Sequence, residues 1–335
     1  MAKKKLIKID AGNLFQNSQQ KTMSTSTSVG FRFLNGKNIK LCPEYDKTAD
    51  GILTVNYFND FVIPEYIPIN GEYYRVTEIG TDSFPKTMES IFIPASINKI
   101  ENGAFSFWPY SVLSKIQVSK DNKYYDSRES CNAVIETATN TLIVACANTI
   151  IPDSVERISE RAFCAVALKS LFIGPNIVHI DFNFAKFFDL EEIKVSDDNK
   201  YYDSRENCNA IIETATNTIL KGCKNTMIPN SVNRLGIASF DTVEGLEAIA
   251  IPDNIDVIDE YAFCNCSSLK EINIPPSIKN IGSCAFYNTS LTSISLKKRN
   301  IKVHKDAFES KVFINGQPRD YWLRPKSRYL DLQKQ

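Results

Sequence analysis

Histidine, glycine and net charge are all scarce in this sequence. The chain of 335 residues holds two histidines and 13 glycines, and its 39 basic residues balance 39 acidic residues. A chain without net charge lacks the long-range field that gathers phosphates or anionic lipids, so we expect neither nucleic-acid binding nor a polybasic membrane contact. Histidine is the usual proton carrier near neutral pH, and its scarcity argues against catalysis.

Long apolar runs are missing as well. The longest of them, such as residues 142–147, fall far short of the ~20 residues that a membrane helix needs, so we predict no membrane span. Residues 1–6 imitate the charged start of a signal peptide, but Lys8, Asp10 and Asn13 interrupt the apolar core that should follow. We therefore predict no signal peptide on this chain.

The residues that are abundant favour strands. Isoleucine is about twice as frequent as leucine, and β-branched residues prefer strands to helices. Nine cysteines in a chain of this length do not make a small disulfide scaffold, and their odd number leaves at least one thiol free or shared with another chain.

A short repeat dominates the second half of the chain. Ala-Phe or Ser-Phe steps end at Phe240, Phe263, Phe286 and Phe308, with spacings of 23, 23 and 22 residues. Between them runs the phrase Leu-x-x-Ile-x-Ile-Pro-x-Ser-Ile-x-x-Ile, which is complete at residues 269–281. Its alternating isoleucines point into a coil, the proline ends the strand, and the second apolar pair fills the coil from the opposite side. The pattern predicts a solenoid of parallel strands, in which neighbouring coils bury one another.

The phrase and the step Phe263-Cys-Asn-Cys-Ser-Ser-Leu269 resemble the BspA-type leucine-rich repeats of bacterial and protozoan surface proteins. The resemblance extends over residues 76–308. It implies a mainly β leucine-rich repeat fold and a non-catalytic module for protein binding and adhesion, with host matrix or cell-surface proteins as partners. It also implies export or a cell-surface location. Because no signal peptide is seen, the alternatives are a cytoplasmic location, unconventional export or a start that is not the native one, so the location stays open.

A longer repeat is superimposed on the short one. Residues 118–155 return at 195–232 with 28 of 38 positions identical, which indicates a recent duplication. In each copy two strand-like runs flank the sequence Thr-Ala-Thr-Asn, at residues 133–136 and 141–144 and again at 210–213 and 218–221. This arrangement predicts two β-hairpins inserted between coils.

The pattern divides the chain into four parts. Residues 1–28 are polar and predict a poorly ordered tail. Residues 29–75 contain strand-like runs that predict an N-terminal β cap, and residues 76–310 form the solenoid. Residues 311–335 are predicted to supply a C-terminal cap and tail.

The best candidate for function is the exposed strand face. The outward middle residues of successive strands are predicted to be Phe92, Gln117, Ile150, Phe172, Lys194, Met227, Ala250, Asn273 and Ser295. Exposed apolar side chains on a sheet face mark contact surfaces, so we predict that the first six of these residues bind a macromolecular partner. The alternatives are that the hairpins or a register error bury these side chains, and that the solenoid is a structural spacer or a self-associating scaffold.

The hairpin cysteines suggest a second hypothesis. Cys131 and Cys146 are 15 residues apart and symmetric about the hairpin turn, and Cys208 and Cys223 repeat this spacing. In a regular hairpin each pair would face across two strands, so we predict a cross-strand disulfide in each copy, with two half-buried thiols as the alternative.

Other candidate sites favour structural explanations. Cys264 and Cys266 lack a second ligand pair for zinc, and Cys266 holds the position of the family's buried turn cysteine. Residues 121–126 and 198–203 lack the spacing of a calcium loop and predict capped turns instead. His179 and His304 are predicted to be ordinary surface residues. We therefore predict no enzyme activity, no cofactor and no metal.

Overall fold

The computed structural model describes residues 7–10, 25–43, 49–57, 60–84, 87–105, 112–164, 166–182, 187–297, 301–324 and 327–333. The chain divides into two compact units, residues 1–167 with 179–181, and residues 168–178 with 182–335. The division falls inside the region 76–310 that the repeats predict as solenoid. Among the described residues, no helix is long and apolar enough to cross a membrane.

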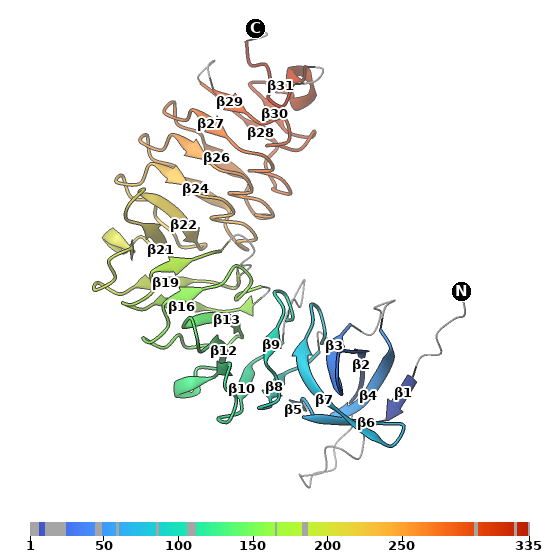
Figure 1. Cartoon of the computed structure of the whole chain (residues 1–335). Helices are drawn as coiled ribbons and strands as arrows, with labels where there is room; N and C mark the ends of the chain where they lie inside the picture. The colour runs from blue at the N-terminus through green and yellow to red at the C-terminus, as the bar shows by residue number, and fades with distance from the viewer. Residues whose placement is uncertain are drawn as a thin grey trace. The chain divides into compact units, whose positions relative to one another are not determined.

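The first unit begins with a sheet of seven strands (Figure 1). Its strands are β1 (Ile7–Asp10), β2 (Thr25–Phe33), β3 (Asn38–Cys42), β4 (Gly51–Tyr57), β6 (Tyr66–Ile69), β7 (Glu72–Ile79) and β9 (Lys99–Ile100), and the order is β1-β4-β2-β3-β7-β6 with β9 also paired to β7. Residues 7–10 and 25–28 therefore lie in strands, although their polar sequence predicted a poorly ordered tail. The remaining residues of that predicted tail lie outside the described residues.

The coils of the first unit begin with three parallel strands, β5 (Asp60–Val62), β8 (Ser90–Ile93) and β10 (Lys115–Val118). Their register aligns Phe61, Ile91 and Ile116, which are buried, as the period of two in the sequence requires. The same register aligns Phe92 with Gln117 on the outward side.

The first hairpin joins the stack of coils. β11 (Tyr125–Asp126), β12 (Ala133–Glu136), β13 (Thr141–Ala145), β14 (Arg157–Ile158) and β17 (His179–Ile180) form one sheet in that order, and β15 (Val166–Ala167) and the short turn η1 (Arg128–Ser130) complete the unit. β13 pairs antiparallel with β12 but parallel with β14. The hairpin is therefore continuous with the repeats, because its second strand takes the place of a coil strand.

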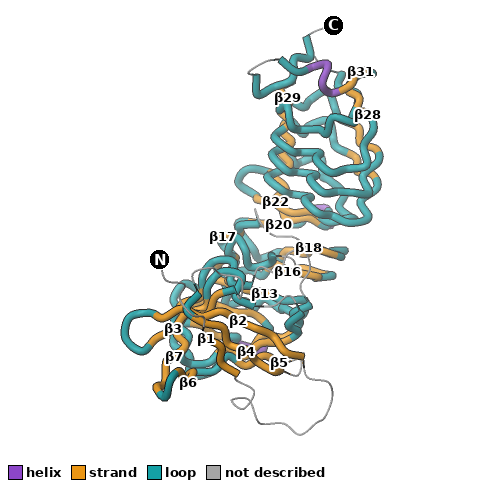
Figure 2. The backbone as a smooth tube through the Cα atoms, turned by 90° about the vertical axis from the view of Figure 1, so that its right-hand side faces the viewer, coloured by secondary structure: helices purple, strands orange, loops and turns teal. Residues whose placement is uncertain are grey.

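The second unit repeats this design and extends it. Its elements are β16 (Ser170–Ile173), β18 (Phe187–Phe188), β19 (Glu192–Val195), β20 (Tyr202–Asp203), η2 (Arg205–Asn207), β21 (Ala210–Glu213), β22 (Thr218–Gly222), β23 (Arg234–Leu235), β24 (Ala248–Ala250), β25 (Val257–Ile258), β26 (Glu271–Asn273), β27 (Asn280–Ile281), β28 (Ser293–Ile294), β29 (Lys302–Val303), β30 (Phe313–Ile314), β31 (Gln317–Pro318) and η3 (Arg319–Trp322). One sheet has the order β20-β21-β22-β23-β25-β27-β29, and shorter sheets pair β16 with β19, β24 with β26, and β28 with β30. Loops and turns make up most of each coil in this unit (Figure 2).

Two features of the repeat phrase build each coil. After the strand, the carbonyl of the proline accepts the N–H of the residue three positions later, as Pro252 does from Ile255 and Pro275 does from Ile278. This bond closes a turn, and proline suits its start because the ring cannot continue the ladder. The second phrase then forms the short parallel strands β25 and β27.

The Ala-Phe steps form a stack of rings through the second unit. Successive ring centroids of Phe240, Phe263, Phe286 and Phe308 are 5.0, 5.3 and 5.0 Å apart, and the rings are nearly parallel. All four side chains are fully buried. Each corner is also hydrogen-bonded to the next coil, since the N–H of Phe263 donates to the carbonyl of Ala285 at 2.8 Å.

The C-terminal segment covers the last coil of the second unit. Trp322 is fully buried, and its indole N–H donates to the carbonyl of Ile314 at 3.2 Å. The N–H of Leu330 donates to the carbonyl of Val303 in β29 at 2.9 Å. These contacts protect the edge of the last coil from water, as a solenoid end requires.

Candidate functional site

We call Phe92 of β8, Gln117 of β10 and Ile150 the first row, because the repeat predicts all three at outward positions of the first unit. Phe92 is half-buried, Gln117 is exposed, and Ile150 is 76% exposed. Ile150 lies in an irregular segment rather than a strand, and its N–H donates to the carbonyl of Cys131 at 3.0 Å. The hairpin therefore leaves Ile150 in solvent, contrary to the alternative that it buries the row.

The second unit carries the corresponding row, formed by Phe172, Lys194 and Met227, which we call the second row. Phe172 and Lys194 face outward at paired positions of β16 and β19. Phe172 is 50% exposed and Met227 is 69% exposed. Phe172 and Lys194 thus face outward from strands as predicted, whereas Met227, like Ile150, is exposed but lies in an irregular segment rather than a strand. The role of these residues in binding stays a prediction.

A surface hollow lies beside each row. The first hollow has a volume of about 370 Å³ and is lined by Phe92, Gln117, Lys120, Ser130 and Asn132, among others. The second hollow has a volume of about 910 Å³ and is lined by Phe172, Lys194, Asp197, Asn207, Asn209 and Met227, among others. The two hollows occupy equivalent places in the two copies of the duplication, because Lys120, Ser130 and Asn132 return as Asp197, Asn207 and Asn209.

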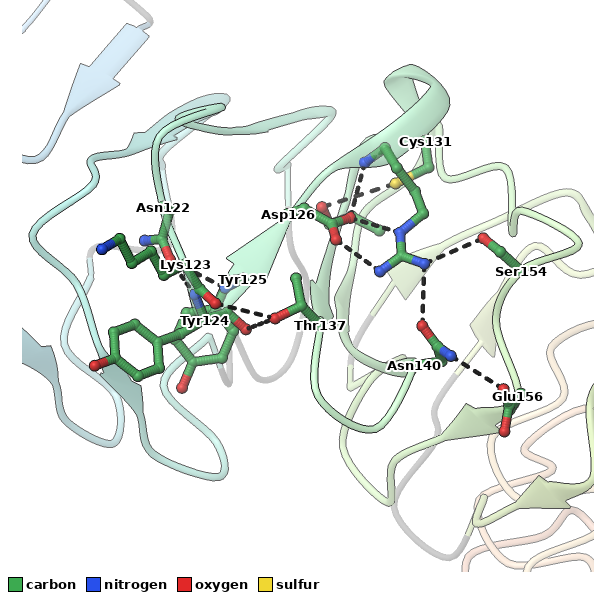
Figure 3. Close-up of polar contacts among 12 residues, drawn as sticks. Asn122, Lys123, Tyr124, Tyr125, Asp126, Cys131, Thr137, Asn140, Ser154 and Glu156 are labelled. Atoms are coloured by element: carbon green, nitrogen blue, oxygen red, sulfur yellow. Dashed lines mark hydrogen bonds and ion pairs between the residues drawn. The ribbon is translucent and has the colours of Figure 1, made fainter.

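One buried asparagine holds the turn beneath each hollow. The amide nitrogen of Asn122 donates to the carbonyls of Pro94 and Ile97 at 2.8 and 2.9 Å. Its amide oxygen accepts the N–H groups of Tyr124 and Tyr125, at 2.9 and 3.0 Å (Figure 3). All the hydrogen-bonding groups of this side chain are satisfied, which explains why an amide rather than a carboxylate stands here.

The second copy contains the same arrangement. Asn199 donates to the carbonyls of Gly174 and Ile177 at 2.7 and 3.0 Å, and accepts the N–H groups of Tyr201 and Tyr202 at 2.9 Å. The segments 121–126 and 198–203 are therefore capped turns, as predicted. Among the described residues, no group of three or more histidine, cysteine or acidic side chains could hold a metal ion.

An arginine then fastens the rim of the hollow to the hairpin. In the first copy Arg128 makes a two-pronged ion pair with Asp126, at 2.9 and 2.7 Å, and donates to the amide oxygen of Asn140 at 3.1 Å. Asn140 in turn donates to Glu156 in the next segment of chain (Figure 3). The hydrogen bonds to Asp126 raise the pKa of the Arg128 guanidinium, so Arg128 stays protonated.

Arg205 repeats this contact in the second copy. It pairs with Asp203 at 2.8 and 2.6 Å and donates to Asn217 at 3.0 Å. Reasoning from sequence missed both arginines as organising residues. The signal that could have found them is their identity in both copies together with Asp126 and Asp203, two positions before each arginine.

The rim between the arginine and the hairpin has left-handed backbone. In the first copy Glu129, Ser130 and Asn132 have φ values of 56°, 55° and 51°. In the second copy the equivalent residues Glu206, Asn207 and Asn209 have φ values of 58°, 50° and 59°. Residues other than glycine seldom adopt this left-handed conformation, so the surrounding contacts must hold the backbone in place.

The cross-strand disulfides are not formed, and a β-bulge explains why. No disulfide joins Cys131 to Cys146 or Cys208 to Cys223. Glu136 pairs with Thr141, but the register shifts by one residue before Ala133 pairs with Ala145, so beyond the strand Cys146 faces position 132 instead of Cys131. The thiol of Cys146 accordingly lies 3.1 Å from the carbonyl oxygen of Asn132.

The second hairpin has the same bulge, so the symmetry that suggested a disulfide between Cys208 and Cys223 fails there too. These cysteines are fully buried, as are Cys131 and Cys146, rather than half-buried. Burial raises the pKa of the Cys131 thiol to about 11.

The remaining candidate residues are Cys266 and the two histidines. Cys266 is fully buried, and its thiol lies 3.0 Å from the carbonyl oxygen of Phe240, as expected of a turn cysteine. His179 is exposed in β17. His304 is partly exposed and accepts the N–H of Asp306 at 3.2 Å.

Comparison with known proteins places the chain among repeat proteins. A family model described as a BspA type leucine rich repeat region matches six copies, over residues 55–141, 143–219 and 209–315. No curated protein matches the chain. The matched region covers most of the sequence, which confirms the repeat fold. The matching family is not a catalytic one.

Solved structures of bacterial proteins are also similar to this chain. The pneumococcal vaccine antigen PcpA is 19% identical to this chain. The alignment covers 87% of this chain and 78% of the PcpA chain, with a TM-score of 0.50. A leucine rich cell surface protein from Faecalibacterium prausnitzii is 20% identical over 87% of both chains, with a TM-score of 0.46. At this level of identity the likeness to PcpA concerns the fold alone.

Proposed function

This chain belongs to the BspA-type leucine-rich repeat family, and we propose that it is a non-catalytic module that binds a protein partner through its two outward rows. The observation that carries the proposal is the exposure of Ile150, Phe172 and Met227, which are 76%, 50% and 69% exposed. Large apolar side chains are costly to leave in water unless a partner covers them.

The surroundings of the rows also suit recognition. Each row lies beside a hollow whose rim is held by an arginine pair, so the apolar side chains project from a rigid and polar frame. Binding energy in protein interfaces concentrates in a few large side chains that are ringed by polar contacts. A partner that covers Phe172 and Met227 would bury both side chains within such a ring.

The test begins with the intact chain as bait. Proteins retained from host matrix extracts and from bacterial extracts, analysed in parallel, are identified and then purified. Binding of the purified partner is measured for the wild-type chain, for Phe172→Asp with Met227→Asp, and for the single change Ile150→Asp. We expect the double change to abolish binding while the thermal unfolding midpoint is retained.

A matched control uses an exposed aromatic residue outside the rows. Tyr287 is 50% exposed at a corner of the second unit, and Tyr287→Asp should leave binding unchanged. Equal loss of binding in the control and in the row variants would contradict the proposal. Concentration-dependent light scattering of the isolated chain would support a self-associating scaffold instead.

Location at the cell surface is the second part of the proposal, and the family resemblance supports it. Protease treatment of intact cells of the source organism should degrade the protein if it lies outside the cell. Survival of the full-length protein, with a known surface protein degraded in the same sample, would place it inside.

A further inference from the structure

The two hollows share a backbone but differ in charge. The second hollow is lined by four acidic side chains, Glu192, Asp197, Asp203 and Glu206, against two basic ones, Lys194 and Arg205. The first hollow is lined by one basic and one acidic side chain, Lys120 and Asp121.

Ion pairs within the second hollow neutralise half of its acidic groups. Asp203 is paired with Arg205 at 2.6 Å, and Glu192 is paired with Lys194 at 2.5 Å. Asp197 and Glu206 are exposed, and no ion pair joins either of them to another described residue. Two negative charges are therefore available to a ligand beside the apolar side chains of Phe172 and Met227.

Comparison of the two copies shows which of these two acidic residues differs between the hollows. Glu206 has the same identity in the first copy, as Glu129, whereas Asp197 replaces Lys120. Asp197 lies on an exposed turn, where either residue type is compatible with the fold. The change reverses the charge at this one position, and the frame of asparagine and arginine contacts is the same in both copies.

We propose that the second hollow binds a cationic polypeptide segment, an apolar side chain flanked by lysine or arginine, and that Asp197 sets this preference. The apolar side chain packs on Phe172 and Met227, and the flanking cations face Asp197 and Glu206. The first hollow, with Lys120 in place of Asp197, does not share the preference. This inference rests on the proposed function, because it names the partner chemistry of the second row.

The chain offers a specific probe for this site. It contains four methionines, of which Met227 is exposed beside the hollow and Met88 is buried in the first unit. Methyl NMR of the full chain labelled at methionine therefore reports on the hollow through Met227 and on unrelated changes through Met88. The change Met227→Leu assigns the signal.

The probes are three octapeptides with a central Leu-Phe pair, flanked on both sides by lysine, by glutamate or by serine. We expect the lysine peptide to shift the Met227 signal in a saturable way, the glutamate peptide to leave it unchanged, and Met88 to stay still throughout. Asp197→Lys should weaken the binding of the lysine peptide about fivefold, since a surface charge contributes modestly to binding. Added salt should weaken the binding of this peptide as well.

Lys120→Asp is the matched control, because it makes the reverse change in the first hollow. This variant should leave the Met227 titration as in the wild-type chain. Equal shifts with the lysine and glutamate peptides, an unaltered affinity in Asp197→Lys, or no shift with any peptide at millimolar concentration would each overturn the inference. The proposed function would survive these results if Phe172→Asp with Met227→Asp still abolished binding of the purified partner.

Discussion

The ammonium group of Lys221 lies 3.1 Å from the carbonyl oxygen of Ala238 inside the second unit, where the side chain of Lys221 is 1% exposed. The same group lies 3.3 Å from the carbonyl of Asp241 and 5.7 Å from the centroid of the Phe187 ring. Two carbonyl oxygens and a ring face thus lie around a buried cation, and Lys221 stands at the position that Val144 holds in the first copy.

Two substitutions of Lys221 separate the contribution of its methylene stem from that of its buried charge. Lys221→Ala leaves a cavity and removes the hydrogen bonds that Lys221 donates to two buried carbonyls, so we expect the free energy of unfolding to fall by about 2–5 kcal/mol. Lys221→Met keeps most of the stem and removes the buried charge, so it should cost clearly less. Urea unfolding of both variants measures the difference, and an equal cost would show that packing of the stem contributes little.

The phenylalanine stack should be the most sensitive part of the second unit. Phe263 lies between two rings and is fully buried, so we expect Phe263→Ala to lower the free energy of unfolding by about 3–5 kcal/mol. Tyr287→Ala, on the exposed side of the adjacent corner, should change it by less than about 0.5 kcal/mol. Chemical denaturation checks both values, and a mild effect of Phe263→Ala would mean that the stack relaxes around the gap.

The buried asparagines predict a pH-dependent variant. In Asn199→Asp the new carboxylate would face the carbonyls of Gly174 and Ile177 without a proton to donate, so we expect a loss of about 2 kcal/mol or more at neutral pH. Burial beside these oxygens should raise the pKa of the new carboxyl above that of the unfolded chain. The folded state then binds more protons than the unfolded state, so part of the lost stability should return as the pH falls.

The control for this variant comes from the duplication. Asn230 is exposed, and the first copy has Asp153 at its position, so Asn230→Asp should change stability little at any pH. Thermal unfolding from neutral pH to about pH 4 compares the two variants with the wild-type chain. A constant difference between Asn199→Asp and the wild type across this range would show that the carboxyl does not titrate with folding.

The register shift in the hairpins predicts that no disulfide joins Cys131 to Cys146 or Cys208 to Cys223. A thiol reagent under denaturing, non-reducing conditions should therefore count all four of these thiols, whereas a thiol count lower by four would indicate two disulfides. In the native chain the half-buried Cys164 and Cys284 should react first. Burial raises the pKa of Cys131 to about 11 and that of Cys266 to about 12, so both stay protonated at pH 8 and should react slowly. Fast reaction of all nine thiols in the native chain would contradict this order.

The sequence could predict those features that depend on residues close together along the chain. The Phe stack and the turn after Pro275 arise from a phrase repeated every 22 or 23 residues, so their spacing alone predicted the coil. The outward positions of Phe172 and Lys194 followed from the period of two in a strand. The error at Cys131 and Cys146 has the opposite cause, because a bulge inserts one residue into a strand that looks regular in sequence.

The sequence by itself therefore determined the repeat, the inward and outward faces of its strands and the family, because each depends on neighbours along the chain. Only the tertiary structure decided the remaining features. Arg128 reaches Asn140 across the hairpin, and Lys221 is buried among carbonyls from a later coil. Such contacts join residues that no local period connects, and their geometry exists only once the coils are stacked.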